Sequence, residues 1–94
     1  MVVGLCTYEM HLAAAQSLKD KRRVLKSVID RVKNKFNVSI AEVDYQDSWQ
    51  RAAVGVAVVS NNSIHVNQVI TNVTKFIENA NDEIEVTDVL VEII

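Results

Sequence analysis

The chain has 94 residues, of which 49% are hydrophobic, with two Gly, no Pro and one Cys, so its composition excludes a disordered, collagen-like or disulfide-stabilised protein. Its length allows one core, and we expect a single domain over residues 1–94, cytoplasmic because no secretory signal pattern opens the chain. The net charge of −2 hides an asymmetry, because residues 19–35 hold eight Lys or Arg against two acids, a net charge of +6, whereas the remainder carries −8. An acidic chain can therefore still present one basic face.

The first half of the chain predicts a strand followed by a helix. Residues 2–12 alternate between two sets of side chains, and we expect the set that includes Cys6 and Tyr8 to face the core. Ser17 followed by Asp20 resembles a capping box with Asp in place of Glu. Apolar residues then recur at helical spacing, which predicts a helix from Leu18 to Lys35.

The second half predicts a hairpin, a helix and a last strand. Residues 37–45 alternate, 46–50 form a polar connection, and the apolar run 52–59 predicts a central strand because both of its sides are apolar. Asn62 or Ser63 can cap a second helix that ends at 79–82, and residues 84–94 form the last strand. The uncharged stretch 52–74 is long enough to cross a bilayer, but polar residues interrupt it, so we expect no membrane span.

The predicted order is strand, helix, strand, strand, helix, strand. Right-handed crossovers over one shared sheet then give an α+β, ferredoxin-like βαββαβ fold, with a four-stranded antiparallel sheet and two helices on one face.

Two long motifs resemble a known family. The run SLKDKRRVLKS at 17–27 and the run FNVSIAEVDYQDSWQRAAVGVAVVS at 36–60 are similar to the YlxP-like family of small uncharacterised bacterial proteins, as is the opening strand MVVGLCTYEMHL. The resemblance implies the ferredoxin-like fold. It also implies an association with translation or ribosome maturation, since some members' genes lie among those for translation factors.

The start of the first predicted helix is unusually basic. A helix N-terminus carries unpaired N–H groups and about half a positive charge, so a cation there typically costs about 0.3–1 kcal/mol. A row of cations beside free N–H groups suits phosphates, and a row of this length suits a nucleic-acid backbone. The helical wheel places Lys21 nearer the buried side than the rest. The candidate nucleic-acid or anion-binding residues are Lys19, Lys21, Arg22, Arg23 and Lys26.

A plainer interpretation of this basic start is equally compatible with the sequence. The cations could pair with acids of neighbouring elements, such as Asp44, Asp47 or a residue of the last strand, and serve solubility and orientation.

Two residues beside the hairpin connection are candidate partner contacts. Trp49 could stack on a base or on a partner surface, although a lone Trp more often packs over a sheet edge, and Arg51 follows it. Across the open sheet face, Glu9 and His11 could meet Glu42 and Asp44 in an acidic pocket. Cross-strand pairing with Arg51 is the ordinary interpretation, and we expect no metal, since no motif supplies convergent ligands.

The expected function is binding rather than catalysis. No phosphate-cradling Gly loop or activated nucleophile is visible, so we expect neither enzymatic activity nor a cofactor. Two helices cover only one sheet face, and the apolar third strand therefore favours a homodimer through the open face. The leading hypothesis is a small protein that contacts RNA or a ribosomal subunit through its basic helix. The alternative is a homodimeric protein–protein interaction module with no nucleic-acid role.

Overall fold

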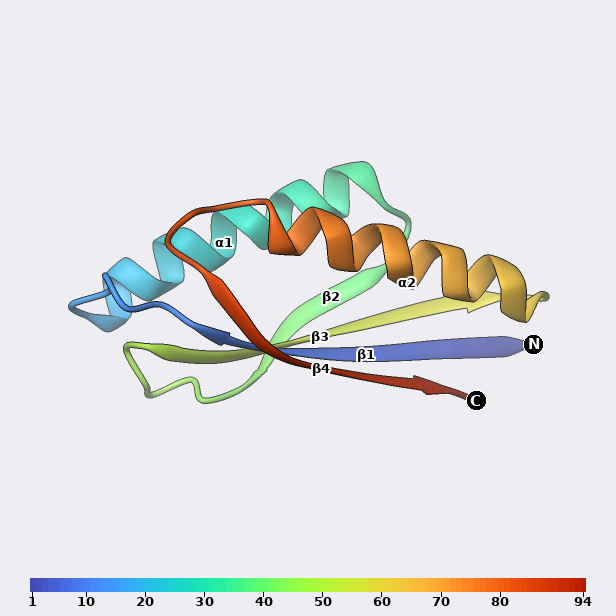
Figure 1. Ribbon diagram of the computed structural model, residues 1–94, viewed down its shortest axis with the longest axis horizontal. Helices are drawn as coiled ribbons and strands as arrows, with labels where there is room; N and C mark the ends of the chain where they lie inside the picture. The colour runs from blue at the N-terminus through green and yellow to red at the C-terminus, as the bar shows by residue number, and fades with distance from the viewer.

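The computed structural model describes all 94 residues and contains four strands and two helices (Figure 1). In chain order they are β1 (Val2–His11), α1 (Leu18–Lys35), β2 (Ser39–Asp44), β3 (Arg51–Ser60), α2 (Ser63–Glu78) and β4 (Glu85–Ile93). The predicted element order is confirmed, and the predicted bounds of α1 match the observed ones. The second strand begins two residues later than predicted.

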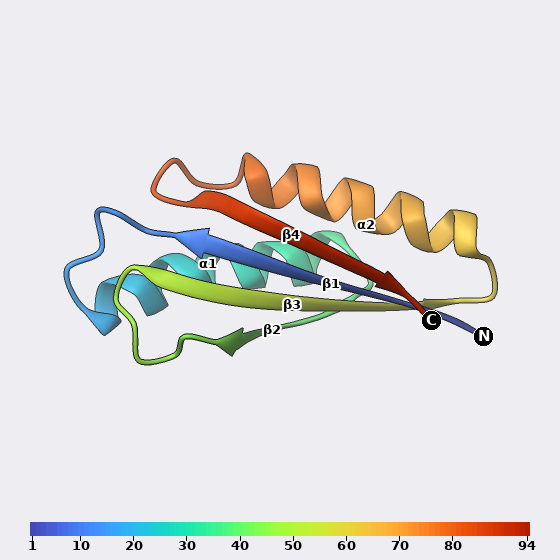
Figure 2. The same ribbon diagram turned by 60° about the horizontal axis from the view of Figure 1, so that its bottom comes forward.

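The four strands form one antiparallel sheet in the order β2-β3-β1-β4. Both helices lie on the same face of this sheet (Figure 1), which confirms the ferredoxin-like α+β fold and the central position of β3. In Figure 2 the uncovered face comes forward, with β4 and β2 at its two edges. Neither helix combines the length and apolarity needed to cross a bilayer.

The core lies between the sheet and the two helices. Alternate residues of β1 point into it, from Cys6 to Met10, because successive side chains of a strand point to opposite faces. Each helix adds one apolar stripe at three- and four-residue spacing. The buried residues of the two stripes are Val24, Leu25, Val28, Val32, Val66, Ile70, Val73 and Ile77.

Side-chain caps fix both helix starts. The Ser17 hydroxyl accepts a hydrogen bond from the Asp20 N–H (3.1 Å), and the Asp20 carboxylate accepts one from the Gln16 N–H (3.2 Å). The predicted capping box with Asp in place of Glu is thus present. Its carboxylate accepts from the N–H of Gln16, one residue before the N-cap, and not from that of Ser17 itself. At α2, the Asn62 side chain accepts from the Ile64 and His65 N–H groups.

Gly4 marks the closest approach between β1 and α2. A methyl group added there would clash with Val66 Cγ1 and lie 2.7 Å from Ile70 Cδ1, both of which belong to the buried stripe of α2. The absence of a side chain at Gly4 therefore sets how closely this helix packs on the sheet.

Replacing Gly4 with Ala should destabilise the fold. The added methyl group forces α2 away from the sheet, and overpacking of this kind costs about 1–3 kcal/mol. Gly55→Ala is the matched control, because its methyl group would meet only the half-exposed Val43 side chain at 3.0 Å. Urea unfolding of both variants checks this, and equal midpoints for the two would contradict the tight approach.

Candidate nucleic-acid interface

Helix α1 presents a row of cations on the side away from the sheet. Lys19, Arg22, Arg23 and Lys26 are all exposed in its first half, and Lys33 continues the row in its last turn. We call these five residues the basic row. The structure thus brings four of the five predicted binding residues onto one surface.

Lys21, the fifth predicted residue, lies on the opposite side of the helix and is completely buried. Its Nζ donates to the carbonyl oxygens of Tyr45 (2.7 Å) and Arg51 (3.1 Å), and the Gln46 carbonyl lies at 3.5 Å. An oxygen of the Glu42 carboxylate lies 3.0 Å from Nζ, outside hydrogen-bond geometry, so that contact is an ion pair. The Lys21 ammonium is fully engaged inside the protein and is not available to an external anion.

The Lys21 contacts hold an unfavourable turn after β2. Tyr45 has a φ of 61°, in the left-handed region that costs a non-glycine residue roughly 1–2 kcal/mol. Its carbonyl accepts from Lys21 and also from the Ser48 N–H (3.0 Å), and its hydroxyl donates to Glu9 (3.0 Å). The Arg51 guanidinium stacks over its ring at 4.0 Å. These contacts fix the backbone where β2 leads into β3.

The basic row has little internal neutralisation. The structure contains three ion pairs, which are Lys21–Glu42, Lys26–Asp30 and Arg51–Glu9. Only the Lys26–Asp30 pair involves the row, and its 2.7 Å hydrogen bond lowers the pKa of Asp30 and raises that of Lys26. The alternative, pairing with acids of neighbouring elements, holds for Lys21, which pairs with Glu42 of β2, but no cation of the row pairs with Asp44, Asp47 or an acid of β4. The cations at 19, 22, 23 and 33 therefore have no ion-pair partner.

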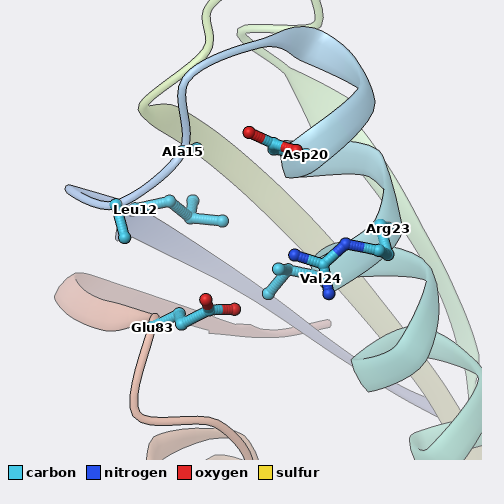
Figure 3. Close-up of a pocket in the computed structure, with 7 residues that line it drawn as sticks. Leu12, Ala15, Asp20, Arg23, Val24 and Glu83 are labelled. Carbon is cyan, nitrogen blue, oxygen red and sulfur yellow. The ribbon is translucent and has the colours of Figure 1, made fainter.

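A small hollow adjoins the basic row at the start of α1. It encloses about 80 Å³ between the β1–α1 connection, the first turns of α1 and the α2–β4 connection. Figure 3 shows the Arg23 guanidinium directed into this hollow, between the carboxylates of Asp20 and Glu83. Because two carboxylates flank the guanidinium, the hollow itself does not attract a phosphate.

The open sheet face differs from the predicted acidic pocket. A bulge at Val43 separates Glu42 from Asp44, so Glu42 turns under α1 toward Lys21 while Asp44 stays beside Ala53 on the open face. The expectation that Glu42 joins Glu9 on that face is therefore wrong. No three His, Cys, Asp or Glu side chains come together in a way that could hold a metal ion.

Arg51 makes the cross-strand pair that the sequence predicts. Its guanidinium lies 3.7 Å from the Glu9 carboxylate, and the Tyr45 hydroxyl donates to the same oxygen, which raises the pKa of that hydroxyl. Trp49 is exposed over 54% of its surface in the connection between β2 and β3. Whether either residue contacts a partner stays a prediction.

Small apolar residues make up the centre of the open face. β3 contributes Ala53, Gly55 and Ala57 to this face, and Val43 lies over Gly55. Neighbouring side chains bury Ala53 without a second layer, so an apolar sequence on both sides of β3 does not by itself require a covering partner. The homodimer through this face stays a prediction.

A family model and a known bacterial protein both match most of this chain. A family model described as "Protein of unknown function (DUF503)" matches residues 3–91. The chain belongs to the DUF503 family. It is 44% identical over 77 residues to "Uncharacterized protein YlxP" of Bacillus subtilis (strain 168), which covers 82% of this chain and 84% of that protein. The resemblance to YlxP-like proteins is thereby confirmed.

A solved structure shares the fold of this DUF503 chain. The de novo designed protein Foldit4 is similar with a TM-score of 0.54 and 14% sequence identity, over 100% of this chain and 97% of that one. A likeness at this identity concerns the fold alone.

Cys6 is the one thiol of this DUF503 chain, and it lies in the core. It is 1% exposed, and burial raises its pKa, so the neutral thiol prevails at neutral pH. This environment is that of a packing residue and not that of an activated nucleophile.

Removing the Lys21 ammonium should strongly destabilise this chain. Lys21→Met leaves the Glu42 carboxylate without its counter-ion and removes the hydrogen bonds from Nζ to the Tyr45 and Arg51 carbonyls, and loss of one partner of a buried pair costs about 3–5 kcal/mol. The expected value lies at the lower end because the Glu42 side chain is 20% exposed. Lys19→Met is the control, since this exposed side chain has no partner and surface changes stay within about 0.5 kcal/mol. Equal urea midpoints for the two variants would show that the Lys21 contacts add nothing.

Proposed function

We propose that this DUF503 protein binds RNA through the basic row of α1. The observation that carries the proposal is the exposure of Lys19, Arg22, Arg23 and Lys33 with no ion-pair partner on a chain that is acidic overall. Phosphate groups supply the missing counter-charges, and binding releases the counterions that surround an RNA backbone.

The length of the basic row favours a polymer over a small anion. From Lys19 to Lys33 it spans 14 residue steps of helix, which is about 21 Å along the axis at 1.5 Å per residue. A single phosphate reaches only one end of such a row. Several consecutive phosphates of one strand can meet it along its length.

The composition of the open face favours the helix side of the molecule as the RNA contact. An RNA-recognition sheet stacks bases on aromatic residues of its central strands, whereas β3 offers Ala53, Gly55 and Ala57 on its open face. Three carboxylates, those of Asp44, Glu9 and Asp88, also occupy one cross-strand row of that face. The proposed contact is therefore made to the backbone, with little dependence on base sequence.

Association with a ribosomal subunit is the specific form of this proposal, and it follows from the family resemblance together with the basic row. In this form, the chain would bind exposed ribosomal RNA on the surface of a subunit. Co-sedimentation of the tagged protein with subunits through sucrose gradients, at low and moderate salt, addresses this form directly.

Neutralising the basic row should abolish RNA binding while the fold is kept. In the variant K19Q/R22Q/R23Q/K26Q, the affinity for single-stranded RNA should fall, because four phosphate contacts are lost. For the wild-type chain, the slope of log K against log salt should be about −3.5, at about −0.7 for each of the five cations of the row. The measurement is fluorescence anisotropy with a labelled oligonucleotide over a salt series.

The chain offers a control with the same change in charge. The variant R31Q/K35Q/R51Q/K75Q removes four exposed cations outside the basic row, so a purely global charge effect weakens binding equally in both variants. Retained affinity in the control beside loss in the row variant supports the proposal. Unchanged affinity and salt slope in the row variant would refute it, and circular dichroism confirms that both variants are folded.

A further inference from the structure

The edge strand β4 concentrates the exposed apolar surface of the molecule. Ten large hydrophobic side chains are exposed, and five of them lie between Val89 and Ile94, with exposed fractions from 38% to 71%. Figure 2 shows β4 at one edge of the sheet, with no strand beyond it. An exposed, apolar edge strand is a template for pairing with another strand.

The backbone of β4 has its free hydrogen-bonding groups at the same residues. Val3 and Ile94 exchange two backbone hydrogen bonds, of 2.9 and 2.8 Å, so the polar groups of Ile94 face β1. The direction of the backbone N–H and C=O groups alternates from residue to residue along an antiparallel strand. The N–H and C=O groups of Val89, Val91 and Ile93 therefore point away from β1, to the edge of the sheet. The side chains of these three residues lie on the helix-covered face, opposite Tyr8, Cys6 and Gly4.

We propose that β4 pairs antiparallel with β4 of a second copy of this chain, with Val91 opposite Val91 of the other copy. In this register Val89 meets Ile93 on the helix side, and both strands direct free N–H and C=O groups toward each other. On the open side, Leu90 meets Glu92 and Asp88 meets Ile94. The two sheets become one continuous sheet of eight strands.

The distribution of charges along β4 selects this register. A pairing centred on Leu90 places Asp88 directly opposite Glu92 at two positions, and like charges in that relation are destabilising. A pairing centred on Val89 extends into the irregular segment at Thr87, where the β1–β4 register shifts. The register centred on Val91 opposes no two acids and uses the regular part of the strand from 88 to 94.

The same reasoning favours the edge over the open face as the contact between copies. A face-to-face dimer with its two-fold axis along the strands stacks the acidic row of Asp44, Glu9 and Asp88 on itself. Edge pairing leaves these carboxylates in solvent. It therefore buries the apolar strand without burying unpaired charge.

Edge pairing also sets the relation between the two basic rows. All four helices remain on one face of the continuous sheet, and α1 contacts β2, the strand farthest from β4 in each copy. The two basic rows then lie at opposite ends of that face and point to the same side. If the proposed RNA binding holds, one RNA can engage both rows and gain avidity, but the pairing itself does not depend on RNA.

Sedimentation equilibrium of the full chain without RNA tests the pairing. The wild-type chain should sediment as a dimer, and Val91→Lys should sediment as a monomer. Ile64→Lys is the control, because Ile64 is an exposed aliphatic residue on α2, away from β4, and this variant should stay dimeric. A monomeric wild-type chain at millimolar concentration overturns the proposal, as does a dimer that Ala57→Arg dissociates and Val91→Lys leaves intact, which would place the contact on the open face.

Cysteine cross-linking tests the register. Opposed residues of a hydrogen-bonded antiparallel pair have Cα atoms about 5.5 Å apart, inside the range of about 4.4–6.8 Å for a disulfide, so Val91→Cys should oxidise to a covalent dimer. Val89→Cys should not, because its counterpart lies four residues away along the partner strand, at more than about 13 Å. The native Cys6 lies directly opposite Val91 in the β1–β4 pairing, so both variants also carry Cys6→Ala, which prevents a disulfide within one chain. Equal cross-linking of both variants would refute the register.

Discussion

The buried ammonium of Lys21 is the interaction on which the arrangement of the basic helix depends. It joins the first turn of α1 to the end of β2 and the start of β3 through two carbonyls and the Glu42 carboxylate. A buried charge is tolerated only with such partners, so the rotation of α1 about its axis is constrained. With Lys21 inward, Lys19, Arg22 and Lys26 turn outward together, and Arg23 lies beside them at the rim of the hollow. One inward cation therefore positions the four exposed ones.

The molecule separates its charges between two surfaces. The helix layer carries the basic row, whereas Asp44, Glu9 and Asp88 line up across the open sheet face. A polyanion is attracted to the first surface and repelled by the second, which orients the protein before contact is made. The acids on the open side of β4 also limit which strand can pair with that edge, because a register that opposes two carboxylates is disfavoured.

Much of the fold could be predicted from periodicity, whereas the surroundings of single side chains could not. The bounds of α1 follow from its cap and apolar stripe, and the burial of Lys21 follows in part from its place on the helical wheel. Its acceptors lie 24 to 30 residues away in sequence, and no local pattern identifies them. The bulge at Val43 separates the directions of Glu42 and Asp44: Glu42 keeps the helix-side facing of Ile40, and the extra residue moves Asp44 to the open face.

The first turn of α1 shows why its charges point to binding and not only to solubility. Asp20 supplies one acid at the helix start, and Glu42 compensates Lys21, but Lys19, Arg22 and Arg23 have no ion-pair partner near the positive end of the helix dipole. Solubility could be met by acids at these positions, which would stabilise the helix at the same time. A sequence that keeps cations where acids are more stable departs from the local rule, and such departures are expected where a surface meets a ligand. In the proposed complex, the phosphate backbone of RNA would supply the negative charge that this helix start lacks.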